Sequence, residues 1–362
     1  MGHKNILEVC LSPDLGGLEL FVMNCYESFK TKTSCYVVVE EGKKLDIQIE
    51  GTEKKHLKRN KFFPFIPALK LAKIIDKDKI DVIHFHWTRD ILTVVLAKIF
   101  SSRKPKIVQS RHMTMTRFKD DIYHKWLYKN IDMIHAVTYQ VKEQLERFIP
   151  LDVRPKIEMV YIGTKLNSKS VIKSTTILEN YSIVEGEFIV GIVGRIEEGK
   201  GQWIVIDAIA QLKDLNIKLL IVGDAMDKVY LDSLKQSVKE HGVEDKVIFT
   251  GFTKEVTAHL QVCDITVLAT PKETFGLVVI ESMANKVPVI ATNNGGPLEI
   301  IEDTVDGLLF NRTVDNLVEK LKLIYTDKIL SEKLSHNAYK KILDKFDEEK
   351  QFMKLQKVLD ES

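Results

Sequence analysis

The sequence has 362 residues, of which 44% are hydrophobic and 29% charged, and its formal net charge is +2. This length exceeds what one compact core usually supports, so we expect two domains. No apolar run reaches the ~20 residues of a membrane-spanning helix, and the first residues lack the apolar segment of a signal peptide, which together predict a cytoplasmic protein. Four cysteines without CxxC spacing predict reduced thiols, not disulfides or a metal cluster: Cys10, Cys25, Cys35 and Cys263.

Charge is distributed unevenly along the chain. Residues 1–180 contain 31 Lys and Arg against 21 Asp and Glu, a difference of +10, whereas residues 181–362 contain 22 against 30, a difference of −8. A basic half and an acidic half are typical of two domains that meet different partners. The same asymmetry would also arise if the two halves simply attract each other.

Short apolar, β-branched segments alternate along the chain with segments of helical periodicity. They predict strands at 6–11, 35–39, 81–86, 106–110 and 132–138, and again at 188–194, 218–223, 246–251, 264–270 and 287–292. Nearly continuous apolar strands separated by helices indicate parallel sheets covered on both faces. We therefore predict an α/β fold with two tandem Rossmann-like, doubly wound domains.

The domain boundaries follow from composition. The polar, weakly periodic stretch 164–180 is the expected linker, and helical patterns fill 313–360. We predict domains at 1–170 and 171–345, followed by a helix at 346–362 that returns to the N-terminal domain.

In such folds, ligands bind beyond the carboxyl ends of the strands. The first predicted strand is followed by SPDLGGLE, in which Gly16 and Gly17 precede a helical segment. Glycines allow a close backbone approach, and free N–H groups at a helix start can hold an anion. Alternatively, the pair only forms a tight turn. No segment has GxGxxG spacing, which disfavours a nicotinamide-dependent dehydrogenase.

A second glycine-rich turn, GRIEEGKG at 194–201, follows the strand at 188–194. Arg195 can bind phosphate through two donors and Lys200 adds a point charge, so the pair could hold a diphosphate. The turn lacks the order of a Walker A motif. A solvated loop with two ordinary cations is an equally good interpretation.

The strand at 264–270 is followed by ETFGLVVIE at 273–281. A helix is expected to begin at 275–277, and its first N–H groups have no partner within the helix, so they fit a phosphate. Glu273 precedes this turn. Glu281 falls about two turns into an apolar helix, where an unpaired carboxylate is costly. Sugar hydroxyls would satisfy it, and the alternative partner is a Lys or Arg in the core.

Together these motifs resemble the retaining nucleotide-sugar glycosyltransferases of the GT-B fold, in glycosyltransferase family 4. The matching segments keep the family's order and cover nearly the whole chain: LGGLE, DVIHFHW, SRHMT, VGRIEEGKG, VIFTGF and ETFGLVVIESMANKVPVIATNNGGPLEIIEDTVDGLLF. The last of them is the most specific. The resemblance implies that the N-terminal domain binds the acceptor and the C-terminal domain the donor, for which we expect a UDP-sugar rather than a GDP-sugar.

The resemblance also implies roles for single residues. Arg195 and Lys200 would neutralise the donor diphosphate and stabilise it as the leaving group. Glu281 would bind ribose hydroxyls, and Glu273 would hold the hydroxyls of the transferred sugar. Other donor contacts would come from Gly16 and Gly17, from backbone near Phe252, and from the amides of Phe275, Gly276 and Leu277.

His112, in SRHMT, matches a histidine that the family places near the reacting centre. Its neighbour Arg111, together with His86, is expected to contact the acceptor or line the cleft. In the family the acceptor hydroxyl attacks from the face that the leaving group occupies, so the anomeric configuration is retained. Glu273 would then position the sugar without forming a covalent intermediate.

We expect no metal ion. The DxD motif of this chain, Asp76-Lys77-Asp78, lies before a strand at a lysine-rich helix end and is interpreted as a solvated turn. His84 and His86 share one face of a strand and could form a metal pair, but no third ligand is obvious. A structural or acceptor-contacting role is therefore favoured for His86.

The sequence departs from the family at two places. Residues 161–165 read YIGTK where relatives often carry Asn-Gly and then Asp, which puts the contacts of this loop in doubt. Lys286 stands where the family often has Gly.

Residues 54–73 contain seven Lys and Arg and no acid, with three phenylalanines among them, Phe62, Phe63 and Phe65. Basic groups and aromatic rings of this kind predict contact with an anionic membrane surface, peripheral and on the inner face of the cell membrane. The alternative is a solvated loop before a helix whose phenylalanines enter the core. No nucleic-acid-binding motif accompanies the charge, so nucleic acid is not an expected partner.

The expected function is transfer of a sugar to a glycan or lipid-linked acceptor in bacterial surface polysaccharide synthesis, such as lipopolysaccharide, capsule or exopolysaccharide. Three alternatives remain open. The chain could be a nucleotide-sugar 2-epimerase or a phosphorylase on the same fold. It could also be a non-catalytic subunit that binds a sugar nucleotide, although intact Arg195, Lys200, Glu273 and Glu281 disfavour this.

Overall fold

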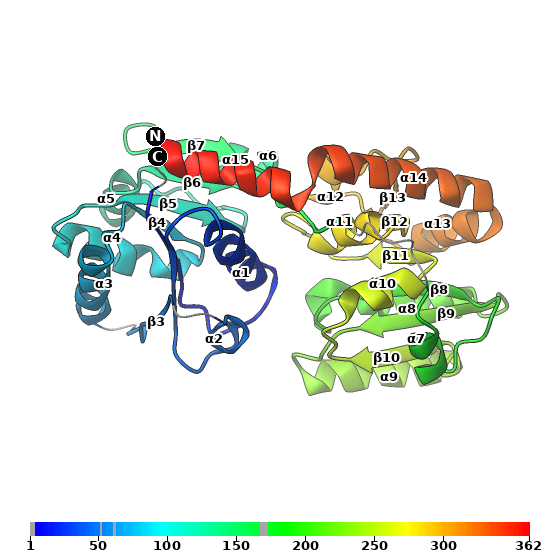
Figure 1. Ribbon diagram of the computed structural model, residues 1–362. Helices are drawn as coiled ribbons and strands as arrows, with labels where there is room; N and C mark the ends of the chain where they lie inside the picture. Colours follow the sequence, from blue (N-terminus) through cyan, green and yellow to red (C-terminus); the bar gives the residue numbers. More distant parts are fainter. Residues whose placement is uncertain (1–3, 51–52, 61–62, 167–172) are drawn as a thin grey trace. The chain divides into compact units, whose positions relative to one another are not determined.

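The computed structural model describes residues 4–50, 53–60, 63–166 and 173–362, which form two compact units. Unit 1 contains the chain up to Ile162 together with Glu349–Ser362, and unit 2 is Gly163–Glu348. The predicted α/β class and the two doubly wound, parallel-stranded domains are confirmed (Figure 1). The division falls eight residues before the predicted boundary at 170. Residues 167–172 of the predicted linker 164–180 lie outside the described residues.

Unit 1 is built on a parallel sheet with the strand order β3-β2-β1-β4-β5-β6-β7. The strands are β1 (Ile6–Cys10), β2 (Cys35–Val39), β3 (Lys54–His56), β4 (Val82–Phe85), β5 (Lys106–Arg111), β6 (Met133–Ala136) and β7 (Lys156–Met159). The helices are α1 (Gly17–Phe29), α2 (Lys44–Gln48), α3 (Phe65–Lys77), α4 (Ile91–Phe100), α5 (Ile122–Lys129), α6 (Tyr139–Phe148) and α15 (Glu348–Glu361), with a 3-10 turn η1 (Thr88–Asp90).

Unit 2 repeats this architecture with the strand order β10-β9-β8-β11-β12-β13. The strands are β8 (Phe188–Val193), β9 (Ile217–Val222), β10 (Val247–Gly251), β11 (Ile265–Leu268), β12 (Val289–Thr292) and β13 (Leu308–Phe310). The helices are α7 (Thr175–Asn180), α8 (Gln202–Gln211), α9 (Lys228–His241), α10 (Val256–Val262), α11 (Leu277–Ala284), α12 (Pro297–Ile300), α13 (Val314–Thr326) and α14 (Lys328–Lys345), with a 3-10 turn η2 (Glu198–Lys200).

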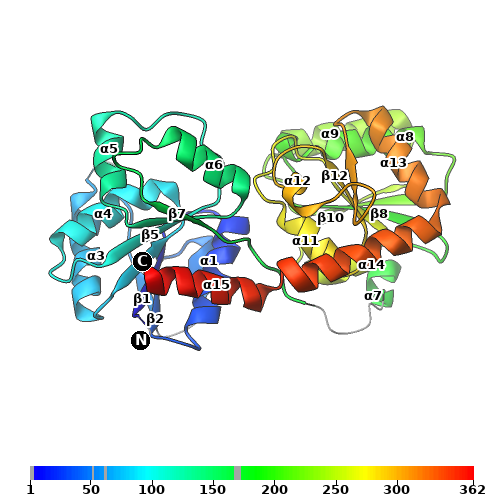
Figure 2. The same ribbon diagram turned by 90° about the horizontal axis from the view of Figure 1, so that it is seen from above.

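Apolar residues of the strands meet helices on both faces of the unit 2 sheet. One core packs the sheet against α8, α9 and α13, and a second core packs it against α7 and α10 (Figures 1 and 2). Strands buried on both sides need apolar residues at nearly every position, which is why all ten predicted strands are present. The three strands that the sequence did not predict, β3, β7 and β13, lie at sheet edges. β3 and β7 are partly exposed and lack the apolar signal, whereas β13 is buried but only three residues long.

The C-terminal helix α15 packs within unit 1. The ring of Phe352 lies 5.9 Å from the rings of both Phe21 and Phe29 of α1, and the Lys4 ammonium donates to the carbonyls of Leu359 and Ser362. Figure 2 shows α15 beside α1. The final helix therefore closes the apolar surface of α1 that the preceding part of unit 1 leaves open.

The chain crosses from unit 1 into unit 2 at Gly163, beside the point at which it crosses back. A Cβ at Gly163 would lie 2.4 Å from the Cα of Glu348, so only glycine fits against this returning backbone. The Thr164 amide also donates to the Phe346 carbonyl at 2.8 Å. The departure at Lys286 has a backbone cost as well, because Lys286 adopts a φ of +58°, a conformation that glycine takes more easily.

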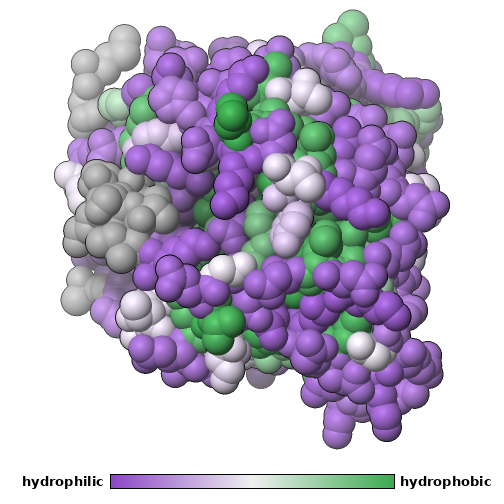
Figure 3. All heavy atoms as spheres, turned by 90° about the vertical axis from the view of Figure 1, so that its right-hand side faces the viewer, coloured by the Kyte–Doolittle hydropathy of each residue, from purple (hydrophilic) through white to green (hydrophobic). Residues whose placement is uncertain are grey.

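The face drawn in Figure 3 is dominated by hydrophilic side chains, and apolar side chains show between them. Among the helices of the described residues, none combines the length and the apolar composition that crossing a membrane would require.

Candidate functional site

In unit 2 the predicted donor residues gather at the point where the strand order reverses. β8 and β11 are neighbours, yet the chain continues from β8 toward β9 and from β11 toward β12. Loops that leave adjacent strands in opposite directions open a crevice, and ligands of doubly wound sheets bind there. The loop after β8 carries Arg195 and Lys200, and the loop after β11 carries Glu273.

An ion pair joins these two loops. The Lys200 ammonium donates to Oε2 of Glu273 at 3.2 Å, so a predicted phosphate ligand and a predicted sugar ligand are in direct contact. Arg195 points instead to Glu197, at 3.2 Å, and its side chain is 45% exposed. Both cations thus contact carboxylates, and an arriving diphosphate would compete with those carboxylates for them. The more exposed pair, Arg195 with Glu197, is of a weak kind, so Arg195 can be released from it at little cost.

Two residues that sequence reasoning did not single out hold the loop after β8. Gly201 caps α8 with a φ of +75°, and a Cβ there would lie 2.6 Å from the Ala269 carbonyl oxygen. The side chain of Gln202 is buried and donates to the Arg195 carbonyl at 2.9 Å. The backbone that carries Arg195 is therefore held in place, and its partly exposed guanidinium contacts Glu197.

The loop after β11 rests on Gly295 and Gly296. A Cβ on either would approach a carbonyl oxygen, of Glu273 or of Phe275, to 2.3 Å, and the Gly296 amide donates to the Glu273 carbonyl at 2.8 Å. Gly276 itself has a φ of +102° and precedes the first helical residue, Leu277. The predicted start of this helix is confirmed, and its first N–H groups lie at the crevice edge of the sheet.

Glu281 lies on the second turn of α11 and is mostly buried. Its carboxylate has no hydrogen-bond or ion-pair partner among residues 4–50, 53–60, 63–166 and 173–362, so the alternative of a core Lys or Arg is wrong. Burial raises the pKa of Glu281. A ligand that donates hydrogen bonds would satisfy this carboxylate.

Phe252 follows the edge strand β10 and is 64% exposed. Because β9 lies between β10 and β8, Phe252 is two strands, roughly 10 Å, away from the loop of Arg195. This distance leaves room for a nucleoside between them.

In unit 1 the strand order reverses between β1 and β4, and Gly16 and Gly17 follow β1 there. Helix α1 begins at Gly17 as predicted, but its N-terminus already has an anionic partner. The Gly16 amide donates to the carboxylate of Glu19 at 2.9 Å, in a capping box. A phosphate at this helix start would have to displace Glu19, which the sequence analysis did not consider.

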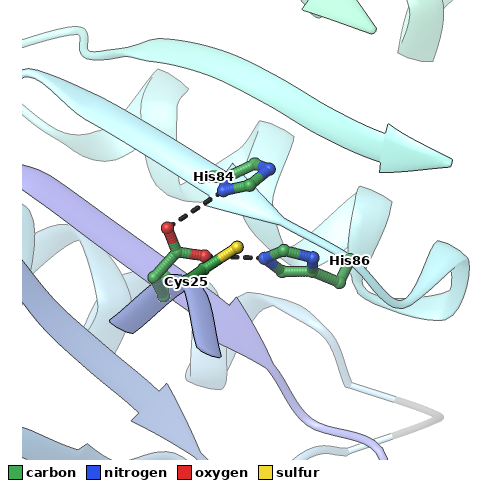
Figure 4. A group of neighbouring side chains, drawn as sticks. Cys25, His84 and His86 are labelled. Carbon is green, nitrogen blue, oxygen red and sulfur yellow. Dashed lines mark hydrogen bonds and ion pairs between the residues drawn. The ribbon is translucent and has the colours of Figure 1, made fainter. Parts of the chain in front are cut away.

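Near the same strand reversal lies a buried network centred on Glu8, and Figure 4 labels two of its members, His84 and His86. One carboxylate oxygen of Glu8 contacts Nδ1 of His84 at 2.9 Å, and the other contacts Nε2 of His86 at 2.6 Å. From His84 the network continues through Ser110 to Nδ1 of His135, whose Nε2 contacts the Val160 carbonyl at 2.7 Å. From His86 it continues to Nε2 of His112, at 3.4 Å.

The partners fix where the protons lie. A carbonyl only accepts, so His135 donates from Nε2 and its Nδ1 accepts from the Ser110 hydroxyl. Ser110 then accepts from Nε2 of His84. Nδ1 of His84 donates to Glu8, because the lowered pKa of Glu8, about 2, keeps its carboxylate ionised. His84 therefore carries both ring protons. We infer a buried ion pair of His84 with Glu8.

The proton positions of His86 and His112 follow in the same way. Burial would by itself raise the pKa of Glu8, but the charge of His84 and the hydrogen bonds from both rings hold it at about 2. Burial and the charge of His84 lower the pKa of His86 to about 4, so neutral His86 donates from Nε2 and accepts at Nδ1. His112 must donate from Nε2, which leaves its Nδ1 as a free acceptor.

Glu8, Cys25, His84 and His86 could also be considered as a metal site, because one ligand atom of each lies within 4.8 Å of the others. Glu8 is the third ligand that the sequence analysis did not find. However, each carboxylate oxygen serves a different imidazole, at hydrogen-bond distance, and every nitrogen of both rings has a partner. The geometry is that of a proton network.

The other two predicted residues of unit 1 are anchored to the protein. His86 is 1% exposed and has no surface for an acceptor, so it can act only through His112. Arg111 is 8% exposed and donates to the carbonyls of Met113 and Thr114 and to the Thr88 hydroxyl, which holds the loop after β5.

Comparisons with known proteins agree with the two-domain fold. The family model for glycosyl transferases group 1 matches residues 173–341, and the model for glycosyl transferase 4-like domains matches residues 8–138. An uncharacterized glycosyltransferase of Methanocaldococcus jannaschii is 29% identical over 96% of this chain and 95% of its own. The capsular polysaccharide biosynthesis glycosyltransferase CapM of Staphylococcus aureus is 25% identical over 84% of this chain and 87% of its own. The crystal structure of Anabaena Alr3699/HepE with UDP and glucose has a TM-score of 0.86 at 20% identity and covers 99% of both chains.

Proposed function

Given that this chain belongs to the GT-B glycosyltransferases of the family 4 type, we propose that it transfers a sugar from a nucleoside diphosphate donor with retention of anomeric configuration. The observation that carries the proposal is the cluster in unit 2, where Lys200 and Glu273 bridge the strand reversal and Glu281 offers a carboxylate without a partner in the described part of the chain. A diphosphate, a sugar and a ribose match these three groups.

The chemistry needs a stabilised leaving group. As the bond between the anomeric carbon and the phosphate oxygen breaks, negative charge builds on the diphosphate. Arg195, Lys200 and the N–H groups at the start of α11 stabilise this charge, which fixed donors do without reorganisation. These cations replace a metal ion in the proposal. The acceptor hydroxyl attacks from the same face, and Glu273 positions the transferred sugar. His112 is the residue of unit 1 that we propose to act at the reacting centre.

UDP is the nucleotide that we propose for the donor, supported by the Anabaena protein, whose structure holds UDP and glucose. For the acceptor we propose a glycan or lipid-linked acceptor of surface polysaccharide synthesis, supported by the capsule relative.

Calorimetric titration with UDP, GDP and ADP, each with and without EDTA, tests the donor site. We expect UDP to bind without a metal and Glu281→Ala to weaken it about tenfold to a hundredfold, because the variant loses hydrogen bonds to a charged acceptor. Glu244→Ala, which removes an exposed carboxylate before β10, is the matched control. Binding that needs a divalent ion, or that survives in Glu281→Ala, would contradict the assignment.

Product analysis separates the alternative functions. A transferase forms glycoside only when acceptor is present. Epimerised donor without acceptor would indicate the 2-epimerase, a requirement for phosphate would indicate the phosphorylase, and binding without turnover would indicate the non-catalytic subunit.

Peripheral membrane contact is the second part of the proposal and rests on the start of α3. Phe63 is 64% exposed, and Phe65 and Ile66 are each 56% exposed. The alternative that the phenylalanines enter the core is therefore wrong for Phe63 and Phe65. Phe62 lies outside the described residues. Of the cations in this stretch, Lys54 and Lys55 form ion pairs with Asp46 and Asp78.

Sedimentation with anionic lipid vesicles tests this contact. We expect the double variant Phe63→Ala/Phe65→Ala to bind such vesicles at least about tenfold more weakly than wild type, since each substitution removes an aromatic ring from the membrane interface. The control is Ile329→Ala, which truncates an 82% exposed apolar side chain of unit 2. Equal binding of both variants would mean that α3 does not meet the membrane.

A further inference from the structure

Unit 1 contains a cavity of about 370 Å³ at the carboxyl ends of β3, β4 and β5. It lies at the edge of the sheet where ligands of this fold bind. The wall combines cationic and aromatic side chains: Arg59, Arg89, Arg111, Lys119, Tyr123 and Tyr128.

None of the four cations of this cavity forms an ion pair within 4.0 Å with a carboxylate of the residues that the structure describes. Elsewhere in unit 1, Lys54, Lys98 and Arg103 each form an ion pair. All the oxygens that Arg111 contacts are uncharged. Burial, followed by the charge of Arg111, lowers the pKa of Lys119, which agrees with cations that crowd one another.

Two of the cations are held in place by one aromatic ring. The guanidinium carbons of Arg59 and Arg89 lie 4.8 Å and 5.4 Å from the ring centroid of Trp87. Stacking of this kind fixes a guanidinium while its N–H groups remain available. The cavity therefore has preorganised donors.

Two acidic groups, Asp121 and Asp90, lie near enough to act electrostatically on Lys119 and Arg59, but neither forms an ion pair with them. Asp121 is exposed and contacts His124. Asp90 is buried and accepts from the Leu11 amide, and burial raises its pKa to about 7 although the charge of Arg59 acts to lower it. Neither contacts one of the four cations.

We propose that this cavity binds a phosphate or diphosphate group of the acceptor. The inference rests on the proposed transferase function and names the chemical class of its acceptor. A single carboxylate would leave most of the four cations uncompensated, whereas phosphate carries more charge and accepts from several donors at once. The two sources of such a group are a lipid-linked diphosphate and a soluble sugar phosphate. Pro64, which also lines the cavity, lies directly before the exposed apolar residues of α3.

Titration of the full-length protein with pyrophosphate, in saturating UDP so that the donor site is filled, tests the proposal. We expect pyrophosphate to bind wild type and to bind Arg89→Gln and Lys119→Gln at least about tenfold more weakly, because each variant loses a charge-assisted hydrogen bond. Lys129→Gln removes an exposed cation at the end of α5, the helix whose first residues line the cavity, and is expected to bind like wild type. UDP affinity, measured first, is expected to stay unchanged in all three variants.

The other outcomes are distinct. If wild type does not bind UDP, the donor site is contradicted. If UDP binds but pyrophosphate does not, or if pyrophosphate binds wild type and all variants equally, only the acceptor pocket is overturned. If succinate binds more tightly than pyrophosphate, the cavity recognises carboxylates and the phosphate proposal is wrong. Displacement of pyrophosphate by farnesyl diphosphate would support a lipid-linked source, and displacement by glucose 1-phosphate a soluble one. If neither displaces it, the proposal fails.

Discussion

Replacing Lys200 by alanine lowers the rate of sugar transfer at saturating donor by about a hundredfold to a thousandfold, the loss typical of a removed transition-state donor. Lys200 is the cation that contacts Glu273, so it lies between the diphosphate and the transferred sugar of the proposed complex. Negative charge on the diphosphate grows as the bond breaks. The interaction with Lys200 is therefore stronger in the transition state than in the bound donor, and the loss falls mainly on the rate constant.

The measurement is kcat and KM with a UDP-sugar once the acceptor is known, or the rate of donor hydrolysis before that. Lys213→Ala is the control, since Lys213 is an exposed lysine just beyond the other end of α8. Lys200→Arg should recover part of the rate because the charge remains. A Lys200→Ala variant that retains kcat and changes only KM would show that Lys200 binds donor without stabilising the leaving group.

The central strands of both sheets could be predicted because burial on both faces leaves them with an apolar composition. A central parallel strand needs apolar residues on both faces, whereas the edge strand β3 reads Lys-Lys-His and has no such signature. The donor residues were accessible for a related reason. They lie in single loops after β8 and β11, so that a short motif contains each group.

Contacts between distant segments could not be predicted in this way. Glu8 lies 76 residues from His84 and 78 from His86. No motif around Glu8 in the sequence indicates that it hydrogen-bonds to these histidines. The support of Glu273 by Gly295 and Gly296 depends likewise on the packing of two loops. Nothing in the sequence around Gln202 indicates that its side chain donates to the Arg195 carbonyl. The sequence contains these side chains, but their roles arise from tertiary structure.

The second large effect concerns stability. We expect Glu8→Ala to destabilise unit 1 by about 3–5 kcal/mol, the cost of removing one partner from a buried ion pair. The variant leaves His84 with a proton that has no acceptor, at a position where Glu8 and His84 are both 0% exposed. Glu158→Ala is the matched control on β7 of the same sheet. Glu158 forms an exposed pair with Lys156 and should contribute less than about 1 kcal/mol.

Urea unfolding followed by tryptophan fluorescence can resolve unit 1 by itself. Of the three tryptophans, Trp87 and Trp126 belong to unit 1 and Trp203 to unit 2, so a Trp203→Phe background reports unit 1 alone. Equal midpoints for Glu8→Ala and Glu158→Ala would exclude a buried ion pair. Glu8→Gln should fall between wild type and Glu8→Ala, since the amide keeps the shape and one hydrogen bond without the charge.

The pH dependence of the same unfolding has a definite sign. Burial lowers the pKa of His86 to about 4 and that of His135 to about 3, from 6.5, so the unfolded chain takes up these protons first. Their contribution to stability is complete above pH 6.5 and declines as the pH falls, by roughly 3 kcal/mol for the two together between pH 6.5 and 5. Glu8 acts at lower pH, because its contribution is present above 4.5 and is lost only as the pH falls toward 2. We therefore expect wild-type unit 1 to lose stability from pH 6.5 downward. A stability that is flat between pH 7 and 5 would mean that these histidines do not enter the core in their neutral form, and the proton arrangement that leaves Nδ1 of His112 free would fall with it.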